Sequence, residues 1–206
     1  MLRPAILVAL TFCLAAVSLG QSGSIAATGK FNGQEYSNPK LGFSILVPGG
    51  WTFYDSRQNR AAVEQNVRIA AASGDQHLLA SSQNTEVLFQ AVPPAFDGQE
   101  KQAILSVGVE KIGKQITANA YASLNRSLVL GQSGARLTRD LYTEVLPGGP
   151  VLVGFEVEGA RQGNHYQQRY LITIRHDVAI FIVATFYDDR QKSFIDASLR
   201  TIKFAR

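Results

Sequence analysis

The stretch VAIFIVATF, residues 178–186, is the part of the sequence that decides the fold. It is apolar at nearly every position, whereas a strand with one wet face alternates apolar and polar residues. Such a run is typical of a central strand whose two faces are both covered. We therefore expect residues 178–187 to lie in the middle of a sheet.

The preceding segment, residues 166–175, also has the composition of a strand. Only His176 and Asp177 separate it from the apolar run. A two-residue connection between two strands predicts an antiparallel hairpin, here with Arg175 opposite Val178.

Further strands are predicted on both sides of this hairpin in the sequence. Apolar and polar residues alternate with a period of two in residues 41–47, 103–112 and 151–158. The remaining predicted strands are residues 30–34, 77–81, 86–91, 136–145 and a short one at 202–204. Because these strands follow one another without a regular strand–helix–strand rhythm, we expect a mainly antiparallel sheet.

Three helices are predicted between and after the strands. Residues 57–72 and 118–130 have helical spacing of apolar residues, and a third helix begins near Asp189. Thr117 is placed to cap the second helix. The predicted fold class is α+β, a mainly antiparallel sheet flanked by helices on both faces, in a single domain of residues 27–206.

The N-terminus has the three parts of a secretory signal peptide, which we assign to residues 1–26. Arg3 is followed by an apolar run over residues 5–17 and then by small residues. The apolar run is about 13 residues long, and a bilayer-spanning helix needs about 20. We therefore expect export, to a secreted or periplasmic location, and no transmembrane helix after signal cleavage.

Two cleavage points fit this leader. Small residues stand at the positions that a signal peptidase reads before Gln21 and again before Ala27. The second is slightly preferred because the following residues resemble a loose N-terminus. Either cleavage removes Cys13, so the mature chain is expected to have no disulfide and no thiolate site.

The charge of the chain is mildly basic. The formal net charge is +4, and loss of Arg3 with the leader leaves +3. The basic residues are scattered rather than clustered, so no nucleic-acid partner is predicted. Weak attraction to an anionic surface is compatible with this charge.

Three histidines are the first candidates for chemistry, and none has a partner at zinc-binding spacing. The hairpin register places His165 opposite Asp188, with Asp189 beside them. An imidazole and two carboxylates at one sheet end could bind a ligand or a divalent ion, or transfer a proton. A solvated salt bridge is the more common outcome of such a grouping.

The sequence contains no motif of a nucleophilic serine and no phosphate-binding loop, and we predict no catalytic residue, cofactor or metal site. Aromatic residues crowd one short region, among them Phe43, Trp51 and Tyr54. The simplest interpretation is that Phe43 and Trp51 belong to the core. The alternative is a partly exposed patch, including Trp51 and Tyr54, that binds a ligand or a partner.

Two segments carry a resemblance to a known family. Residues 36–51, YSNPKLGFSILVPGGW, resemble the opening of PsbP-like and Mog-type domains. The closing strand YLIT (170–173), a second apolar strand and the helix FIDASL (194–199) are similar to the way such domains end. The resemblance implies an α/β/α sandwich and an extracytoplasmic accessory or partner-binding role without a shared catalytic set.

Three functions remain open from the sequence. The leading hypothesis is a non-enzymatic accessory protein of the cell envelope or periplasm with a protein partner. The second is an extracytoplasmic hydrolase whose polar groups assemble around His165, Asp188 and Glu158. The third is a peripheral protein held at the envelope surface by its basic charge.

Overall fold

In the computed structural model, strand β10 (Val178–Phe186) lies at the centre of a seven-stranded antiparallel sheet. Every residue of β10 is buried, because both faces of the sheet are covered. The prediction of a central strand is confirmed. The structure describes residues 24–55, 59, 85–94, 101–112, 116–147, 151–161 and 164–205.

The other strands of this large sheet flank β10 in the order β4-β5-β6-β10-β9-β8-β7. Their bounds are β4 (Thr52–Asp55), β5 (Thr85–Val92), β6 (Ile104–Lys111), β7 (Arg136–Val145), β8 (Val151–Arg161) and β9 (Asn164–Arg175). The predicted strand at 77–81 lies outside the described residues, as does the predicted helix at 57–72 apart from Asn59.

The hairpin between β9 and β10 closes as predicted. Arg175 pairs with Val178, and His176 and Asp177 form the connection with φ angles of 49° and 64°. Two successive residues with positive φ twist the chain in the sense that matches the twist of the two strands. The two-residue turn therefore sets the register of the β9–β10 hairpin.

A second, smaller sheet was not predicted. It has four strands in the order β1-β2-β3-β11, with bounds β1 (Lys30–Asn32), β2 (Glu35–Asn38), β3 (Phe43–Leu46) and β11 (Lys203–Phe204). The expectation of a single sheet was wrong. The turn after β3, with Gly50 at a φ of 84°, sends the next strand to the large sheet, and periodicity alone does not say which strands pair.

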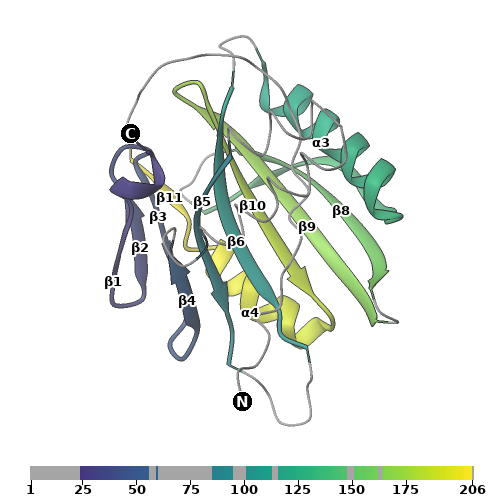
Figure 1. Cartoon of the computed structure of the whole chain (residues 1–206), viewed down its shortest axis with the longest axis horizontal. Coiled ribbons are helices and arrows are strands. Elements are labelled where there is room, and N and C mark those ends of the chain that lie inside the picture. Colours follow the sequence, from purple (N-terminus) through teal and green to yellow (C-terminus); the bar gives the residue numbers. More distant parts are fainter. Residues whose placement is uncertain are drawn as a thin grey trace.

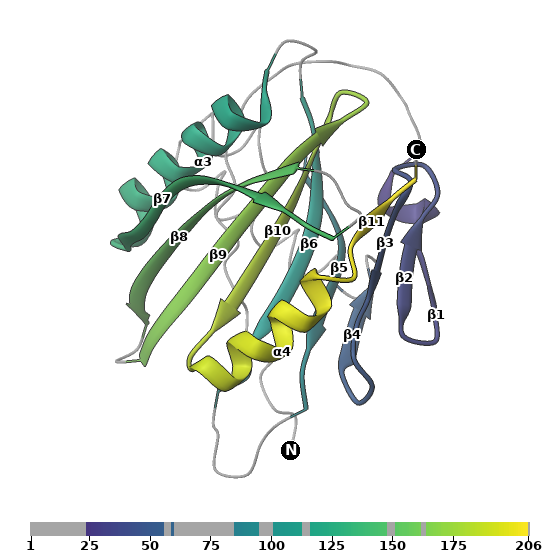
Figure 2. The ribbon, with the colours of Figure 1, turned by 180° about the vertical axis from the view of Figure 1, so that it is seen from behind.

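The two helices of the described part cover opposite faces of the large sheet (Figures 1 and 2). Helix α3 (Ala118–Ser133) packs on β7, β8 and β9, and α4 (Asp189–Leu199) packs on the other face. The small sheet shares a hydrophobic core with the α4 face. The α+β class, with an antiparallel sheet and helices on both faces, is confirmed.

Both helices begin at side-chain caps. The Thr117 hydroxyl accepts a hydrogen bond from the Ala120 amide at 3.2 Å, as predicted, and the Asp188 carboxylate accepts one from the Gln191 amide at 2.7 Å. Neither helix, nor any other in the ranges given above, is long and apolar enough to cross a membrane.

Candidate functional site

His165 and Asp188, predicted to lie opposite each other, fall beyond the end of the pairing between β9 and β10, and their side chains have different surroundings. The pairing of β9 with β10 ends at Gln167 and Phe186. Beyond it, Asp188 leaves the sheet to cap α4, while the exposed His165 lies in β9 opposite Ala160 of β8. The carboxylate of Asp188 therefore has a structural role.

The two other acids of the predicted groupings also lie in structural positions. Glu158 accepts hydrogen bonds from the Arg136 guanidinium, the shorter at 2.5 Å, and Asp189 lies in the first turn of α4. An acid in the first turn stabilises a helix through its dipole. Within the described residues no three metal-ligating side chains come together.

The aromatic residues near the N-terminus divide into buried and exposed members. Phe43 is 1% exposed and Trp51 is 6% exposed, so their interpretation as core is confirmed. Tyr54 in β4 is 41% exposed, and its backbone carbonyl accepts a hydrogen bond from the side chain of Asn59. Binding of a ligand at Trp51 and Tyr54 remains a prediction, and Tyr54 presents the accessible ring.

A connected group of ionised side chains lies between the large sheet and α4, and we call it the Arg169 cluster. Arg169 of β9 donates to Glu156 of β8 at 3.1 Å and to Asp196 of α4 at 2.8 Å. Lys192 donates to the other oxygen of Asp196 at 2.6 Å, and Tyr142 of β7 donates to Glu156 at 3.1 Å. These contacts connect three strands of the sheet to the helix.

The positive and negative charges of the Arg169 cluster balance one another. Burial works against the charge of Arg169, but Asp196 and the neighbouring acids outweigh it, so the pKa of the guanidinium is raised. Each carboxylate is matched by a cation inside the cluster. The geometry therefore describes a clamp that holds α4 on the sheet.

A second polar group lies on the opposite face of the sheet, beside α3, and we call it the Glu110 site. Glu110 of β6 is 1% exposed, and its carboxyl group accepts a hydrogen bond from the hydroxyl of Tyr121 in α3. Its cross-strand partner in β5 is Thr85, whose buried hydroxyl oxygen has no hydrogen-bond partner. No cation of the described chain pairs with Glu110.

Burial dominates the chemistry of the Glu110 site. Desolvation raises the pKa of Glu110 to about 7, although the hydrogen bond from Tyr121 acts in the opposite direction. A carboxyl group with this pKa holds or releases a proton near neutral pH. The arrangement can therefore exchange a proton inside the fold, and it supplies no charged ligand for a metal when the proton is held.

Sequence reasoning did not identify Glu110 or Arg169 as notable residues. The predicted strand 103–112 contains Glu110 on the face opposite Leu105, Val107 and Val109. By the alternation alone, this is the polar face of the strand. The sequence held no local signal for the burial of Glu110, because it did not show that this strand pairs with the fully buried β10 or that α3 covers it.

Within the described ranges, a cross-strand pair of exposed apolar residues lies at the end of the β7–β8 hairpin, and we call it the valine tip. Val145 ends β7 and Val151 begins β8; they pair directly and are 70% and 55% exposed. Leu146 and Leu152, which follow them, are 3% and 1% exposed and belong to the core. The hairpin end is thus anchored by two leucines and presents two valines to solvent.

Comparisons with known proteins find similar structures only. No family model and no curated protein match the chain. The structure of LpqN from Mycobacterium tuberculosis, described as involved in cell envelope biogenesis, is similar with a TM-score of 0.51 and 12% identity, over 80% of this chain and 83% of that one.

The solution structure of PsbP (CyanoP) from Synechocystis sp. PCC 6803 matches with a TM-score of 0.47 and 16% identity, over 92% of this chain and 98% of that one. A putative regulator of unknown function from Pseudomonas aeruginosa, PA94, matches with a TM-score of 0.47 and 14% identity, over 54% of this chain and 78% of that one. At 12% identity the likeness to LpqN concerns the fold alone, and no comparison assigns the chain to a family.

Proposed function

We propose that this chain is an exported, non-enzymatic accessory protein that binds a protein partner in the extracytoplasmic envelope. The observation that carries the proposal is the valine tip. Val145 and Val151 are held outward by the buried leucines beside them, so docking would remove apolar surface from water with little loss of conformational freedom.

The features of β7 favour binding of a partner at the hairpin end. They do not favour pairing of a partner's strand with the edge of the sheet. β7 is one of the two edge strands of the large sheet, and its register with β8 shifts twice along its length. Its exposed residues include Arg136, Arg139 and Asp140. Bulges and charges on an edge strand oppose pairing with another strand, so the tip is the better docking element.

Two further observations support the envelope setting. The sequence begins with the features of a secretory leader, and the fold is similar to that of LpqN, whose description places it in cell envelope biogenesis. These two observations support the location of the protein, whereas the valine tip supports the binding of a partner.

Site-specific photo-crosslinking in intact cells of the source organism tests the proposal. A photoreactive amino acid replaces Val145 in one variant and Leu124 in a matched control, since Leu124 is also exposed, at 42%, but lies on α3. We expect one extracytoplasmic protein to be crosslinked from position 145 and not from position 124. In otherwise native protein, Val145→Glu should abolish co-isolation of the same partner.

Other results would contradict the proposal. Equal crosslinking from both positions, or none from either, would show that the tip is not a docking element. Release of the protein from membranes by moderate salt, without a crosslinked partner, would instead indicate a peripheral protein held by charge.

A further inference from the structure

The first described residues of the chain belong to the fold. Ile25 is 2% exposed and Ala26 is 7% exposed, and both lie in the core that the two sheets share. They lead into a short 3-10 helix, η1 (Ala26–Thr28), which packs against β5. If residues 25 and 26 were removed with the leader, they would not be expected to lie in the core of the folded chain.

Hydrogen bonds hold the same segment on the small sheet. The backbone carbonyl of Ile25 accepts a bond from the side-chain amide of Asn38 at 2.9 Å. The hydroxyl of Thr28 lies 2.8 Å from that carbonyl and 2.9 Å from the Asn38 side-chain oxygen. Asn38 is fully buried, so it depends on these partners.

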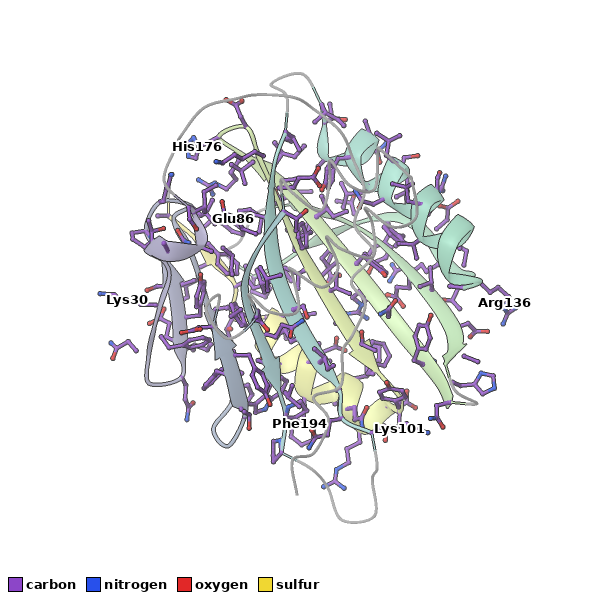
Figure 3. All side chains as sticks on the ribbon, viewed as in Figure 1. Lys30, Glu86, Lys101, Arg136, His176 and Phe194 are labelled. Atoms are coloured by element: carbon purple, nitrogen blue, oxygen red, sulfur yellow. The ribbon has the colours of Figure 1, made fainter. Side chains whose placement is uncertain are left out.

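A carboxylate of the large sheet holds the segment from the other side. Glu86 of β5 accepts a hydrogen bond from the backbone amide of Ala26 at 2.9 Å and from the hydroxyl of Ser24 at 2.5 Å. Figure 3 labels Glu86 beside η1. Residues Ser24 to Thr28 therefore connect the two sheets by apolar contacts and by hydrogen bonds.

We propose that the leader is cleaved after Gly20, so that the mature chain begins at Gln21. Of the two bonds that suit a signal peptidase, the one after Ala26 would remove Ser24, Ile25 and Ala26 from the fold. The side-chain NH2 group of Asn38 would then lose the Ile25 carbonyl as its acceptor, and the carboxylate of Glu86 would lose the hydrogen bonds from Ser24 and Ala26. The core would also lose an isoleucine.

Cleavage after Gly20 keeps all these contacts, and Ser18 and Gly20 are the small residues that the peptidase reads. This proposal differs from the slight preference of the sequence for cleavage before Ala27. It rests on the export of the chain, which belongs to the proposed function.

Intact-mass analysis of the protein isolated from its extracytoplasmic compartment tests the assignment. We expect the mass of residues 21–206, with the N-terminal glutamine either free or cyclised by loss of ammonia. A chain that begins at Ala27, or at any other residue, overturns the assignment. An uncut chain that begins at Met1 and stays in the cytoplasm would also overturn the export on which the proposed function depends.

A stability comparison tests the physical reason separately. Purified chains that begin at Gln21 and at Ala27 are melted under the same conditions, together with Ile25→Ala and the exposed-site control Ala27→Ser in the longer chain. We expect the shorter chain to melt at least about 5 °C lower, Ile25→Ala to lie in between, and Ala27→Ser to match the parent. Equal melting of the two parent chains would contradict the structural argument, and Ile25→Ala remains informative if the shorter chain does not fold.

Discussion

At the scale of single residues, Glu110 shows how burial changes an ordinary acid. Its carboxyl group is covered by the α3 face of the sheet and receives a hydrogen bond from Tyr121, but no cation of the described chain compensates its charge. The folded protein therefore keeps the proton on Glu110 up to about pH 7, where the pKa lies, whereas the unfolded chain releases it at lower pH.

Replacement of Glu110 by glutamine should change how stability depends on pH. The pKa is 4.5 in the unfolded reference and about 7 in the fold, so the stabilisation from the bound proton is complete below pH 4.5 and is lost as the pH rises through 7. We expect the wild type to lose on the order of 3 kcal/mol over this range relative to Glu110→Gln, measured by urea unfolding at several pH values.

The exposed Glu35→Gln is the matched control for this measurement, because it removes the same charge at the surface. Its stability should follow that of the wild type at every pH. Parallel curves for the wild type and Glu110→Gln would show that the Glu110 carboxyl group is ionised in the fold across the range.

A second residue-scale prediction concerns two glycines with opposite surroundings. A Cβ atom on Gly108 of β6 would lie 2.3 Å from ring carbons of the buried Phe181, whereas one on Gly131 of α3 would meet nothing within 4 Å. We expect Gly108→Ala to lower the free energy of unfolding by roughly 1–3 kcal/mol and Gly131→Ala to raise it by about 0.5–1 kcal/mol. Chemical denaturation measures both, and a neutral Gly108→Ala would mean that the ring can move aside.

At the scale of elements, the position of α4 depends on the Arg169 cluster. Arg169 is 10% exposed in its side chain, and its two acidic partners lie on different elements. Arg169→Ala leaves both acids in a partly buried place without their main cation, so we expect a loss of about 3 kcal/mol in equilibrium unfolding.

Arg136→Ala provides the control because it also removes one guanidinium from an ion pair. Arg136 is 79% exposed in its side chain and pairs with Glu158 at the surface, so its removal should cost no more than about 1 kcal/mol. Equal effects of the two substitutions would show that the cluster does not act as a clamp.

The start of α4 gives a prediction that separates capping from ligand binding at Asp188. Because its carboxylate accepts the Gln191 amide, Asp188→Ala should cost about 1 kcal/mol, while Asp188→Asn should keep most of the stability. Thermal unfolding of the two variants measures the difference. If both variants were as stable as the parent, the cap would not contribute.

At the scale of the whole molecule, the two sheets share one hydrophobic core. Residues of the small sheet, β5, β6, β10 and α4 form a single cluster of buried side chains. The C-terminal strand β11 also pairs with β3, which joins the two ends of the described chain in one sheet. The molecule should therefore unfold as one unit rather than as two.

The single tryptophan allows this cooperativity to be measured. Trp51 is buried in the shared core, between β3 and β4, so its fluorescence reports the junction of the two sheets, while far-ultraviolet circular dichroism reports mainly the strands of the large sheet. We expect the two urea transitions to coincide. Separate midpoints would show that the sheets are independent units.

Much of the fold could be predicted from local sequence. The apolar run of β10 indicated a central strand, the connection at His176 and Asp177 set the register of its hairpin, and Thr117 marked the start of α3. These features were predictable because each depends on residues that are close together along the chain or on a simple periodicity.

The division into two sheets, the Glu110 site and the Arg169 cluster were not predictable in the same way. Strand β11 pairs with β3 from the far end of the chain, and Asp196 reaches Arg169 from a helix that packs on another strand. Periodicity tells which face of a strand is apolar, but it does not tell which strand or helix covers that face.

The sequence by itself determined the α+β class, the order of the longer described helices and strands, and the central hydrophobic hairpin, because local backbone preferences and hydrophobic periodicity encode them. The short strands β2 and β4 were not predicted. Only the tertiary structure decided which polar side chains are buried and with which partners, and that Ile25 belongs to the core. The physical reason is that burial and pairing are properties of contacts between residues distant in sequence.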